Sequence, residues 1–321
     1  MSSCCFEFFK TFSVFIVVIQ LVFGVFPWLY KNVVGPKFLE ASNLRQYGNW
    51  ALVTGATDGI GKQFARSLAQ RGFNIVLVSR TLSKLESVAK ELSENFNVQT
   101  HTIAVDFLSG PEIYDQIKQQ ILGKEIGVLI NNVGMSHAAP DYFLNIPDRE
   151  KVIQDIIKCN VTSVPMMCSV ILPQMVQRKN GLIVNIASVV AVIPGPCCAL
   201  YAASKAFITK FSNDLGAEYG YQGINVQVLV TGGVETKMNK TRETTGDDRY
   251  TTPTASVYVE SALRYVGYAR QTTGYLPHSL MEISAQLMTF IAPSFTVGLF
   301  KKLMLSLRDK EIQNGSYTSA K

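Results

Sequence analysis

Hydrophobic positions along the chain follow two different periods. Short, nearly continuous apolar runs rich in β-branched residues are typical of buried strands, whereas apolar residues at every third or fourth position indicate amphipathic helices. The runs predict strands at residues 49–54, 73–79, 98–105, 126–130, 182–186 and 225–230. The helical spacing predicts helices at 62–70, 82–96, from Pro111 onward, 202–218 and 256–268. Strands that alternate with helices predict an α/β fold, a Rossmann-like, doubly wound parallel sheet with helices on both faces.

The N-terminal part of the chain has a different pattern. Residues 11–30 read TFSVFIVVIQLVFGVFPWLY, without a charge. As a helix these twenty residues would extend about 30 Å, the thickness of a bilayer's hydrocarbon core. Trp28 and Tyr30 close the segment, and such rings favour the membrane interface. We expect a transmembrane helix, within an anchor and linker at 1–48. The alternatives are a cleaved signal peptide, a buried core helix and a re-entrant hairpin bent at Pro27.

Charges beside this segment predict its orientation. Glu7 and Lys10 precede it, whereas Lys31, Lys37 and Arg45 follow it. The positive-inside rule therefore places the downstream side, with the predicted α/β domain at 49–275, in the cytosol.

The C-terminal region has two further features. Residues 235–252 are polar and predict a mobile flap over a site. Residues 283–300 carry no charge but contain Pro293 and Gly298. This segment, within a C-terminal region at 276–321, favours an interfacial or re-entrant helix in contact with a membrane. The alternative is a helix that packs on the domain.

The composition narrows the class of protein. Of 321 residues 47% are hydrophobic and 17% charged, which excludes a largely disordered chain. The net charge of +6 is scattered rather than gathered in a basic stripe, so we expect no nucleic-acid partner. The six cysteines lack metal-ligand spacing, so we expect no metal site, and they fit a reducing compartment.

A glycine-rich turn follows the first predicted strand. Residues 54–61 read TGATDGIG, and they open a predicted helix. Gly55 permits a tight turn, Gly59 lets the backbone approach a pyrophosphate, and Gly61 allows close packing. The helix N-terminus offers free N–H groups and a positive dipole end to phosphate. We therefore expect this turn, including Thr57, Asp58 and Ile60, to bind a dinucleotide.

The end of the second predicted strand indicates which dinucleotide. An NAD-binding site usually offers an acidic residue there to the ribose 2′-hydroxyl. This chain has Arg80 instead, and a guanidinium pairs well with a 2′-phosphate. Arg80 therefore favours NADP(H), the alternative being a solvated surface arginine.

A third motif carries the chemistry. Tyr201 and Lys205 stand four residues apart in YAASK, on one face of a predicted helix. A phenol has a pKa near 10, and a nearby ammonium is expected to lower it. Ser188, thirteen residues upstream of Tyr201 and just past a predicted strand, is placed to hold a substrate carbonyl.

These motifs together resemble the short-chain dehydrogenase/reductase family. The resemblance covers about residues 49–236 and includes VDF at 105–107, NNVG at 131–134 and KCNVTS at 158–163. It implies a catalytic tetrad of Asn160, Ser188, Tyr201 and Lys205. Tyr201 would act as general acid, Ser188 would orient the ketone, and Asn160 would hold a relay water. The cofactor-binding residues implied are Gly55, Thr57, Asp58, Gly59, Ile60, Gly61, Arg80, Asp106, Asn132, Gly134, Tyr201, Lys205, Val234 and Thr236.

A narrower resemblance extends over nearly the whole chain. The anchor, QYGNWALVTGATDGIGK, NNVGMS, FLNIPD and TTGYLPHSL are similar to the membrane-bound 17β-hydroxysteroid dehydrogenases of types 3 and 12. The type 12 group includes very-long-chain 3-oxoacyl-CoA reductases. This resemblance implies NADPH, the endoplasmic reticulum membrane, lipid metabolism and a dimer or tetramer through the helix of Tyr201. The chain departs from the family at Thr231, where proline is common, and at Val189, where glycine is usual.

Two functions of different classes follow. The first is an NADPH-dependent ketoreductase, acting on a lipophilic ketone such as a 3-oxoacyl-CoA or a 17-ketosteroid. The second is a non-catalytic membrane protein that keeps the fold as a binding or scaffold module. Loss of the catalytic tyrosine would mark the second function, and Tyr201 is present.

Overall fold

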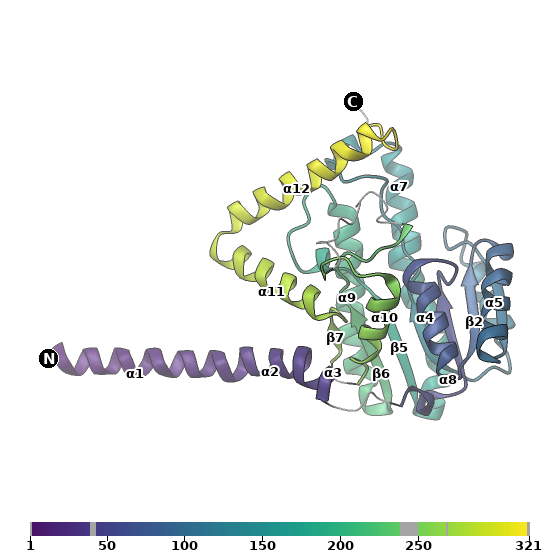
Figure 1. Cartoon of the computed structure of the whole chain (residues 1–321), viewed down its shortest axis with the longest axis horizontal. Helices are drawn as coiled ribbons and strands as arrows, with labels where there is room; N and C mark the ends of the chain where they lie inside the picture. The colour runs from purple at the N-terminus through teal and green to yellow at the C-terminus, as the bar shows by residue number, and fades with distance from the viewer. Residues whose placement is uncertain (1, 39–42, 238–249, 268, 320–321) are drawn as a thin grey trace.

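Seven parallel strands form the centre of the molecule (Figure 1). The computed structural model describes residues 2–38, 43–237, 250–267 and 269–319, without the side chains of 2–6, 9, 17, 20, 21, 37 and 38. The strands are β1 Trp50–Thr54, β2 Asn74–Ser79, β3 Thr100–Ala104, β4 Ile126–Asn131, β5 Gly181–Ile186, β6 Ile224–Leu229 and β7 Gln271–Thr272. Their order in the sheet is β3-β2-β1-β4-β5-β6-β7. The predicted doubly wound parallel sheet is confirmed, with β7 as an additional edge strand.

The sheet is buried on both faces, which explains why its strands read as continuous apolar runs. In β1 the side chains of Ala51 and Val53 join one hydrophobic core, and that of Leu52 joins the other. The same alternation places Ile75 and Val76 of β2 on opposite faces. Two helical layers are therefore needed to cover the sheet.

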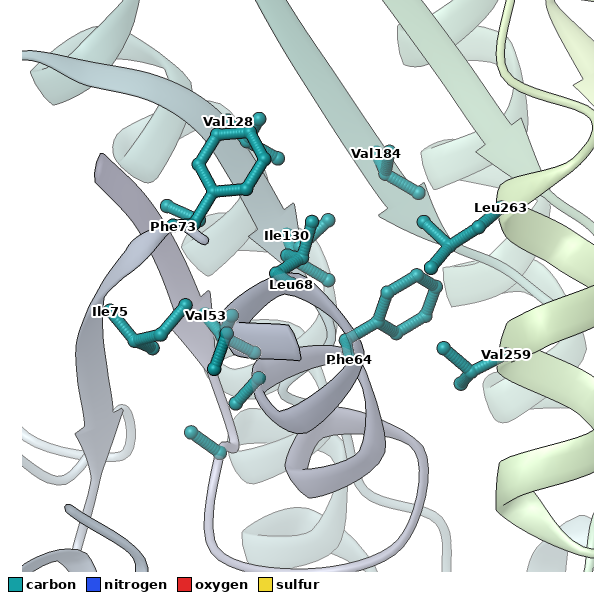
Figure 2. Close-up of a cluster of buried hydrophobic side chains, with 14 of the residues drawn as sticks. Val53, Phe64, Leu68, Phe73, Ile75, Val128, Ile130, Val184, Val259 and Leu263 are labelled. Carbon is teal, nitrogen blue, oxygen red and sulfur yellow. The ribbon is translucent and has the colours of Figure 1, made fainter. Parts of the chain in front are cut away.

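Three helices form the first layer: α4 Gly59–Gln70, α5 Leu82–Phe96 and α10 Ala255–Leu263. Figure 2 shows Phe64 and Leu68 of α4 packed between the sheet and α10. Both side chains are fully buried, and each such burial stabilises the fold by about 1.5–3 kcal/mol. This packing fixes the start of α4, and with it the glycine turn.

The opposite layer contains α6 Glu112–Gln120, α8 Ser163–Arg178 and α9 Ala199–Tyr219. Helix α8 continues α7 Arg149–Ile156 through a π-helical segment, η5 Ile157–Thr162, so that one helix extends over Arg149–Arg178. The sequence analysis did not predict this helix. Among the described residues it is the one helix long and apolar enough to cross a membrane. Half of its most apolar stretch is buried inside the protein, which agrees with a core helix.

The N-terminal segment is a helical rod that projects from the domain (Figure 1). It comprises α1 Ser2–Gln20, η1 Leu21–Val25, α2 Phe26–Leu29, η2 Tyr30–Val34 and α3 Gly35–Phe38. Most of its described apolar side chains are exposed. Three side chains of the predicted span at 11–30 lie outside the described residues, and membrane insertion stays a prediction.

The C-terminal region forms a helical hairpin, α11 Leu276–Ile291 and α12 Pro293–Gln313, that turns at Ala292 (Figure 1). The single broken helix expected at 283–300 is therefore two helices, since Pro293 lies in the first turn of α12, where its missing N–H costs nothing. Short 3₁₀ turns complete the fold: η3 Leu44–Tyr47, η4 Phe143–Asn145, η6 Val189–Ala191 and η7 Gly220–Gln222.

Candidate active site

The glycine turn lies between β1 and α4 at the carboxyl edge of the sheet, where ligands of open α/β sheets bind. Gly55 and Gly59 have φ values of 64° and 52°, a region that side chains disfavour. A Cβ atom on Gly61 would lie 2.3 Å from the Gly55 carbonyl oxygen, and one on Gly59 would lie 2.9 Å from Thr236 Cγ2. Gly59 and Gly61 therefore have no room for a side chain, and the turn packs closely at the N-terminus of α4, the end of a helix that favours phosphate.

Polar side chains brace the turn on both sides. Thr57 Oγ1 and Ser79 Oγ, at the end of β2, are 3.0 Å apart and share a hydrogen bond. Asp58 caps α4 by accepting a hydrogen bond from the Gly59 N–H at 2.8 Å, and it also pairs with Lys237. These interactions hold the turn between β2 and the loop after β6.

Asn132 connects the turn to the neighbouring strand β4. Its side-chain amide donates to the Thr54 and Gly55 carbonyls at 3.0 and 3.3 Å. Its backbone N–H donates to the Thr54 hydroxyl at 3.0 Å. Gly134 follows at the site floor, where a Cβ would lie 3.2 Å from Lys205 Nζ. The NNVG motif therefore joins the cofactor cradle to the catalytic side chains.

Arg80 and Asp106 follow β2 and β3 at the same edge of the sheet. Arg80 is exposed, and it makes no hydrogen bond or ion pair with the part of the chain that the structure describes. Asp106 accepts a hydrogen bond from the Leu108 N–H at 3.0 Å and shapes the turn after β3. Arg80 thus has its guanidinium available to a phosphate beside the glycine turn.

Asn160 lies fully buried in the π-helical segment η5. π-helical turns are rare and often occur at functional sites. The Asn160 amide accepts from the Met135 N–H at 2.8 Å, and it donates to the Met135 carbonyl at 2.9 Å. It also donates to Ser204 Oγ at 3.0 Å, and Ser204 in turn donates to the Tyr201 carbonyl at 2.7 Å. Sequence reasoning missed Ser204, which links the asparagine to the start of α9.

Tyr201, Lys205 and Ser188 come together where β5 ends and α9 begins. The Ser188 side chain lies beside the Tyr201 hydroxyl and favours its ionised form. Lys205 Nζ lies 5.7 Å from the centre of the Tyr201 ring and donates to the Ile186 carbonyl at 3.0 Å. The four residues predicted as catalytic are therefore neighbours in one site.

The electrostatics of this pair correct one expectation. Burial raises the pKa of Tyr201 to about 12, although the hydrogen bond from Ser188 opposes the shift. Burial also lowers the pKa of Lys205 to about 8. The sequence predicted a lowered pKa for Tyr201, and this direction is wrong. Burial disfavours the charged phenolate and is the largest cause of the shift.

The loop after β6 closes the other side of the site. Val234 is buried in the hydrophobic core, and Thr236 packs on the glycine turn. Of the predicted flap at 235–252, residues 238–249 lie outside the described residues, and its two ends meet where the Glu235 N–H donates to the Pro253 carbonyl at 3.0 Å. The described residue Thr236 lies beside the glycine turn, and the cover over the site and its mobility stay predictions.

Sequence reasoning also missed His278, a fully buried residue of α11. The Gly232 N–H donates to His278 Nδ1 at 3.2 Å, so the proton is assigned to Nε2. Nε2 lies 3.1 Å from both the Gly233 and Thr251 carbonyl oxygens. His278 therefore ties the loop after β6 to the far end of the flap.

The two departures from the family pattern lie next to Ser188. The Val189 N–H donates to the Thr231 carbonyl at 2.8 Å, and the Thr231 hydroxyl donates to the Ala187 carbonyl at 3.3 Å. Thr231 thus joins the loops after β5 and β6 with a side-chain donor that proline lacks. As for metals, no group of three potential ligand residues occurs within the described ranges.

Comparisons with known proteins match this geometry. The family model described as short chain dehydrogenase matches residues 49–247. The chain belongs to the short-chain dehydrogenase family. It is 49% identical over 256 residues to the mouse very-long-chain 3-oxoacyl-CoA reductase, covering 79% of this chain and 78% of the mouse protein. It is also 42% identical over 293 residues to the zebrafish very-long-chain 3-oxoacyl-CoA reductase-A, covering 90% and 88%.

Solved structures agree in fold. A short-chain dehydrogenase from Sphingobium yanoikuyae in complex with NADPH is 28% identical, with a TM-score of 0.60 over 67% of this chain and 83% of that one. A 7β-hydroxysteroid dehydrogenase, 23% identical, has a TM-score of 0.71 over 80% and 99%, which supports the fold. The family model and the curated relatives together show that the chain is an oxidoreductase acting on CH–OH groups. The non-catalytic alternative finds no support, since all four side chains predicted as catalytic are present.

Proposed function

We propose that this protein reduces the 3-oxo group of very-long-chain acyl-CoA thioesters with NADPH. The observation that carries the proposal is that Ser188 and the buried Lys205 both lie beside Tyr201, in a chain whose relatives are very-long-chain 3-oxoacyl-CoA reductases. The relatives favour the acyl-CoA over the 17-ketosteroid that the sequence left open.

NADPH fits the residues present. The glycine turn at the N-terminus of α4 would hold the pyrophosphate, and the Arg80 guanidinium would hold the 2′-phosphate. Lys205 and Asn132, which lie next to Gly134, would hold the nicotinamide ribose and the adenosine ribose respectively. When bound, the cofactor supplies the hydride that converts the ketone to an alcohol.

The protein supplies the proton and the orientation. Because burial keeps Tyr201 protonated, its hydroxyl is a neutral acid that donates to the ketone oxygen as negative charge develops there. Ser188, which lies beside that hydroxyl, holds the same oxygen in position. Lys205 stabilises the phenolate left behind, and Asn160 fixes the backbone at Met135 beside it.

We further propose that residues 11–30 anchor the protein in the endoplasmic reticulum membrane with the catalytic domain in the cytosol. The exposed apolar rod and the cations that follow it support this orientation. A membrane location suits a substrate whose acyl chain partitions into lipid.

The full chain in lipid nanodiscs tests the substrate. NADPH oxidation is followed with a very-long-chain 3-oxoacyl-CoA, a short-chain 3-oxoacyl-CoA and a 17-ketosteroid. We expect kcat/KM for the very-long-chain thioester to exceed that of the short-chain thioester by about tenfold or more, since extra buried methylenes contribute about 0.8 kcal/mol each, and to exceed that of the steroid as well. Equal activity on the steroid, or no activity on either thioester, would contradict the proposal.

A further inference from the structure

The C-terminal hairpin presents an apolar surface that the protein leaves uncovered. The side chains at its turn are largely exposed: Phe290 is 86%, Ile291 71% and Phe295 65% exposed. Residues 283–300 contain no charged side chain. Exposed apolar surfaces of this kind are rare on soluble monomers and mark contacts with a protein or a membrane.

The hairpin begins beside the base of the N-terminal rod. Asn32 of η2 is buried, and its side-chain oxygen accepts a hydrogen bond from the Ser279 hydroxyl of α11 at 2.6 Å. Its backbone carbonyl accepts from the Tyr265 hydroxyl at 3.2 Å. A buried polar group with two partners fixes the two elements to each other. Rod and hairpin turn project from the same side of the domain (Figure 1).

Helix α12 changes polarity along its length. Its first eight residues, 293–300, are uncharged, and Lys301 and Lys302 come next, followed by Arg308, Asp309 and Lys310. This order puts apolar side chains at the tip and cations just behind them. Cations at such a border are typical of helices that dip into a leaflet, where they meet lipid phosphates.

We propose that the tip of the α11–α12 hairpin, residues 287–299, inserts into the cytosolic leaflet next to the N-terminal anchor. The inference rests on the proposed anchor. Two features favour lipid as the partner of this surface. The hairpin lies beside the apolar rod, and cations follow its apolar tip. A second copy of this chain would leave Lys301 and Lys302 facing an apolar partner.

Insertion would bring the substrate loops to the membrane surface, because α12 is bonded to them. Lys301 Nζ lies 5.0 Å from the Tyr142 ring centre, and Met304 contacts Cys198 sulfur to sulfur at 3.9 Å. Arg308 pairs with buried Asp141 at 3.1 Å. These contacts hold α12 over the loops after β4 and β5, the loops that border Ser188 and Tyr201. An acyl chain could then pass from the leaflet to the site.

Thiol accessibility in the full chain tests the insertion. Phe290→Cys and, as a matched control, Tyr221→Cys, an aromatic position that is 84% exposed on η7, are each reconstituted in phospholipid nanodiscs. A membrane-impermeant maleimide is added, and peptide mass spectrometry measures labelling at each position separately from the native cysteines. NADPH oxidation with the thioester is recorded for both variants.

We expect position 290 to react about tenfold or more slowly than position 221, because an apolar, water-poor surrounding disfavours the reactive thiolate. Similar labelling rates at the two positions would overturn the inference. A bis-maleimide crosslinker provides a second readout. If position 290 is labelled slowly but is crosslinked to position 290 of a second copy, the inference is overturned as well, because a second copy would then cover the tip. If both variants still oxidise NADPH with the thioester, either of these results contradicts only the membrane contact and leaves the proposed reduction intact.

Discussion

Lys205 lies buried beside the Tyr201 ring, and we assign the two residues different electrostatic roles. Burial keeps the phenol neutral, with its pKa raised to about 12, so Tyr201 is a proton donor throughout the physiological range. The same burial lowers the pKa of Lys205 to about 8, so its charge is poised to change under mildly alkaline conditions. The lysine therefore sets the alkaline limit of reduction.

The pH profile of kcat/KM tests this division. Lys205 is charged below its pKa of about 8 and becomes neutral as the pH rises through that value. Because the charged form stabilises the phenolate product, kcat/KM for reduction should fall on the alkaline side of about pH 8. Initial rates between pH 6 and 10 measure the profile. A flat profile across this range would contradict the assignment.

We propose that Arg80 determines the preference for NADPH over NADH. Removing the guanidinium in Arg80→Ala should raise KM for NADPH by about 10- to 100-fold, because a hydrogen bond to a charged group contributes about 1.5–3 kcal/mol. KM for NADH should change little, since NADH has no 2′-phosphate. Arg264→Ala, at an exposed arginine after α10, is the control and should leave both constants unchanged. Equal effects on the two cofactors would show that Arg80 does not contact the phosphate.

For single residues, the sequence predicted which side chains lie close together in the site. It predicted less well how burial shifts their pKa values. YAASK and Ser188 specified partners on adjacent elements, and the structure brings them together. The pKa of Tyr201 was predicted in the wrong direction because desolvation depends on packing around the ring, which no motif records. Ser204 was missed since a serine inside a helix has no distinctive pattern.

Two helical elements, η5 and α11, place buried side chains that shape the site. The π-helical turn at η5 places Asn160 against Met135, and the start of α11 places His278 under the loop after β6. His278 accepts from Gly232 with the nitrogen that would have to be protonated in an imidazolium. Its bracing role therefore requires the neutral form.

The stability of the fold should reflect this histidine. Burial lowers the pKa of His278 below the value in the unfolded chain, near 6.5, so the unfolded chain takes up a proton first as the pH falls. The thermal midpoint should consequently decrease below about pH 6.5. His278→Leu should show a smaller decrease between pH 7.5 and 5.5 than the parent, while His101 and His137 titrate in both. Equal decreases in parent and variant would exclude a role for His278.

Most elements were predictable because burial on both faces of the sheet leaves a strong apolar signal. Helix α5 lies at the predicted residues 82–96. The helix Arg149–Arg178 was missed because Pro173, two serines and the π-helical turn interrupt its periodicity. The hairpin was merged into one segment because a proline at 293 reads equally as a break or as the first turn of a new helix.

At the scale of the whole molecule, hydrogen bonds hold the C-terminal segment against the loops after β4 and β5. Asp141, after β4, is buried and accepts hydrogen bonds from Arg308, the Tyr317 hydroxyl and the Ser319 hydroxyl at 3.1, 3.1 and 2.8 Å. The Asp141 N–H donates to the Cys197 carbonyl at 3.0 Å. Asp141 thus joins the C-terminal segment to the loops after β4 and β5 through its carboxylate and its backbone N–H, a long-range pairing that local sequence patterns do not reveal.

Loss of this carboxylate should loosen the C-terminus. Asp141→Ala leaves buried donors without an acceptor, and it should lower the free energy of unfolding in urea by about 1–3 kcal/mol. Hydrogen exchange should rise at residues 300–319. Asp214→Ala removes an exposed ion pair with Lys210 and should cost at most about 1 kcal/mol. Equal costs for the two variants would contradict the role assigned to Asp141.

The central claim is that Tyr201 donates the proton in an NADPH-linked reduction of a long 3-oxoacyl-CoA. The most direct measurement is the rate of NADPH oxidation by Tyr201→Phe in nanodiscs under single-turnover conditions, with NADPH affinity measured in parallel. The account predicts a rate lower by about 10²–10⁴-fold, the range for losing a general acid, with NADPH affinity nearly unchanged. An unchanged rate in Tyr201→Phe would contradict it.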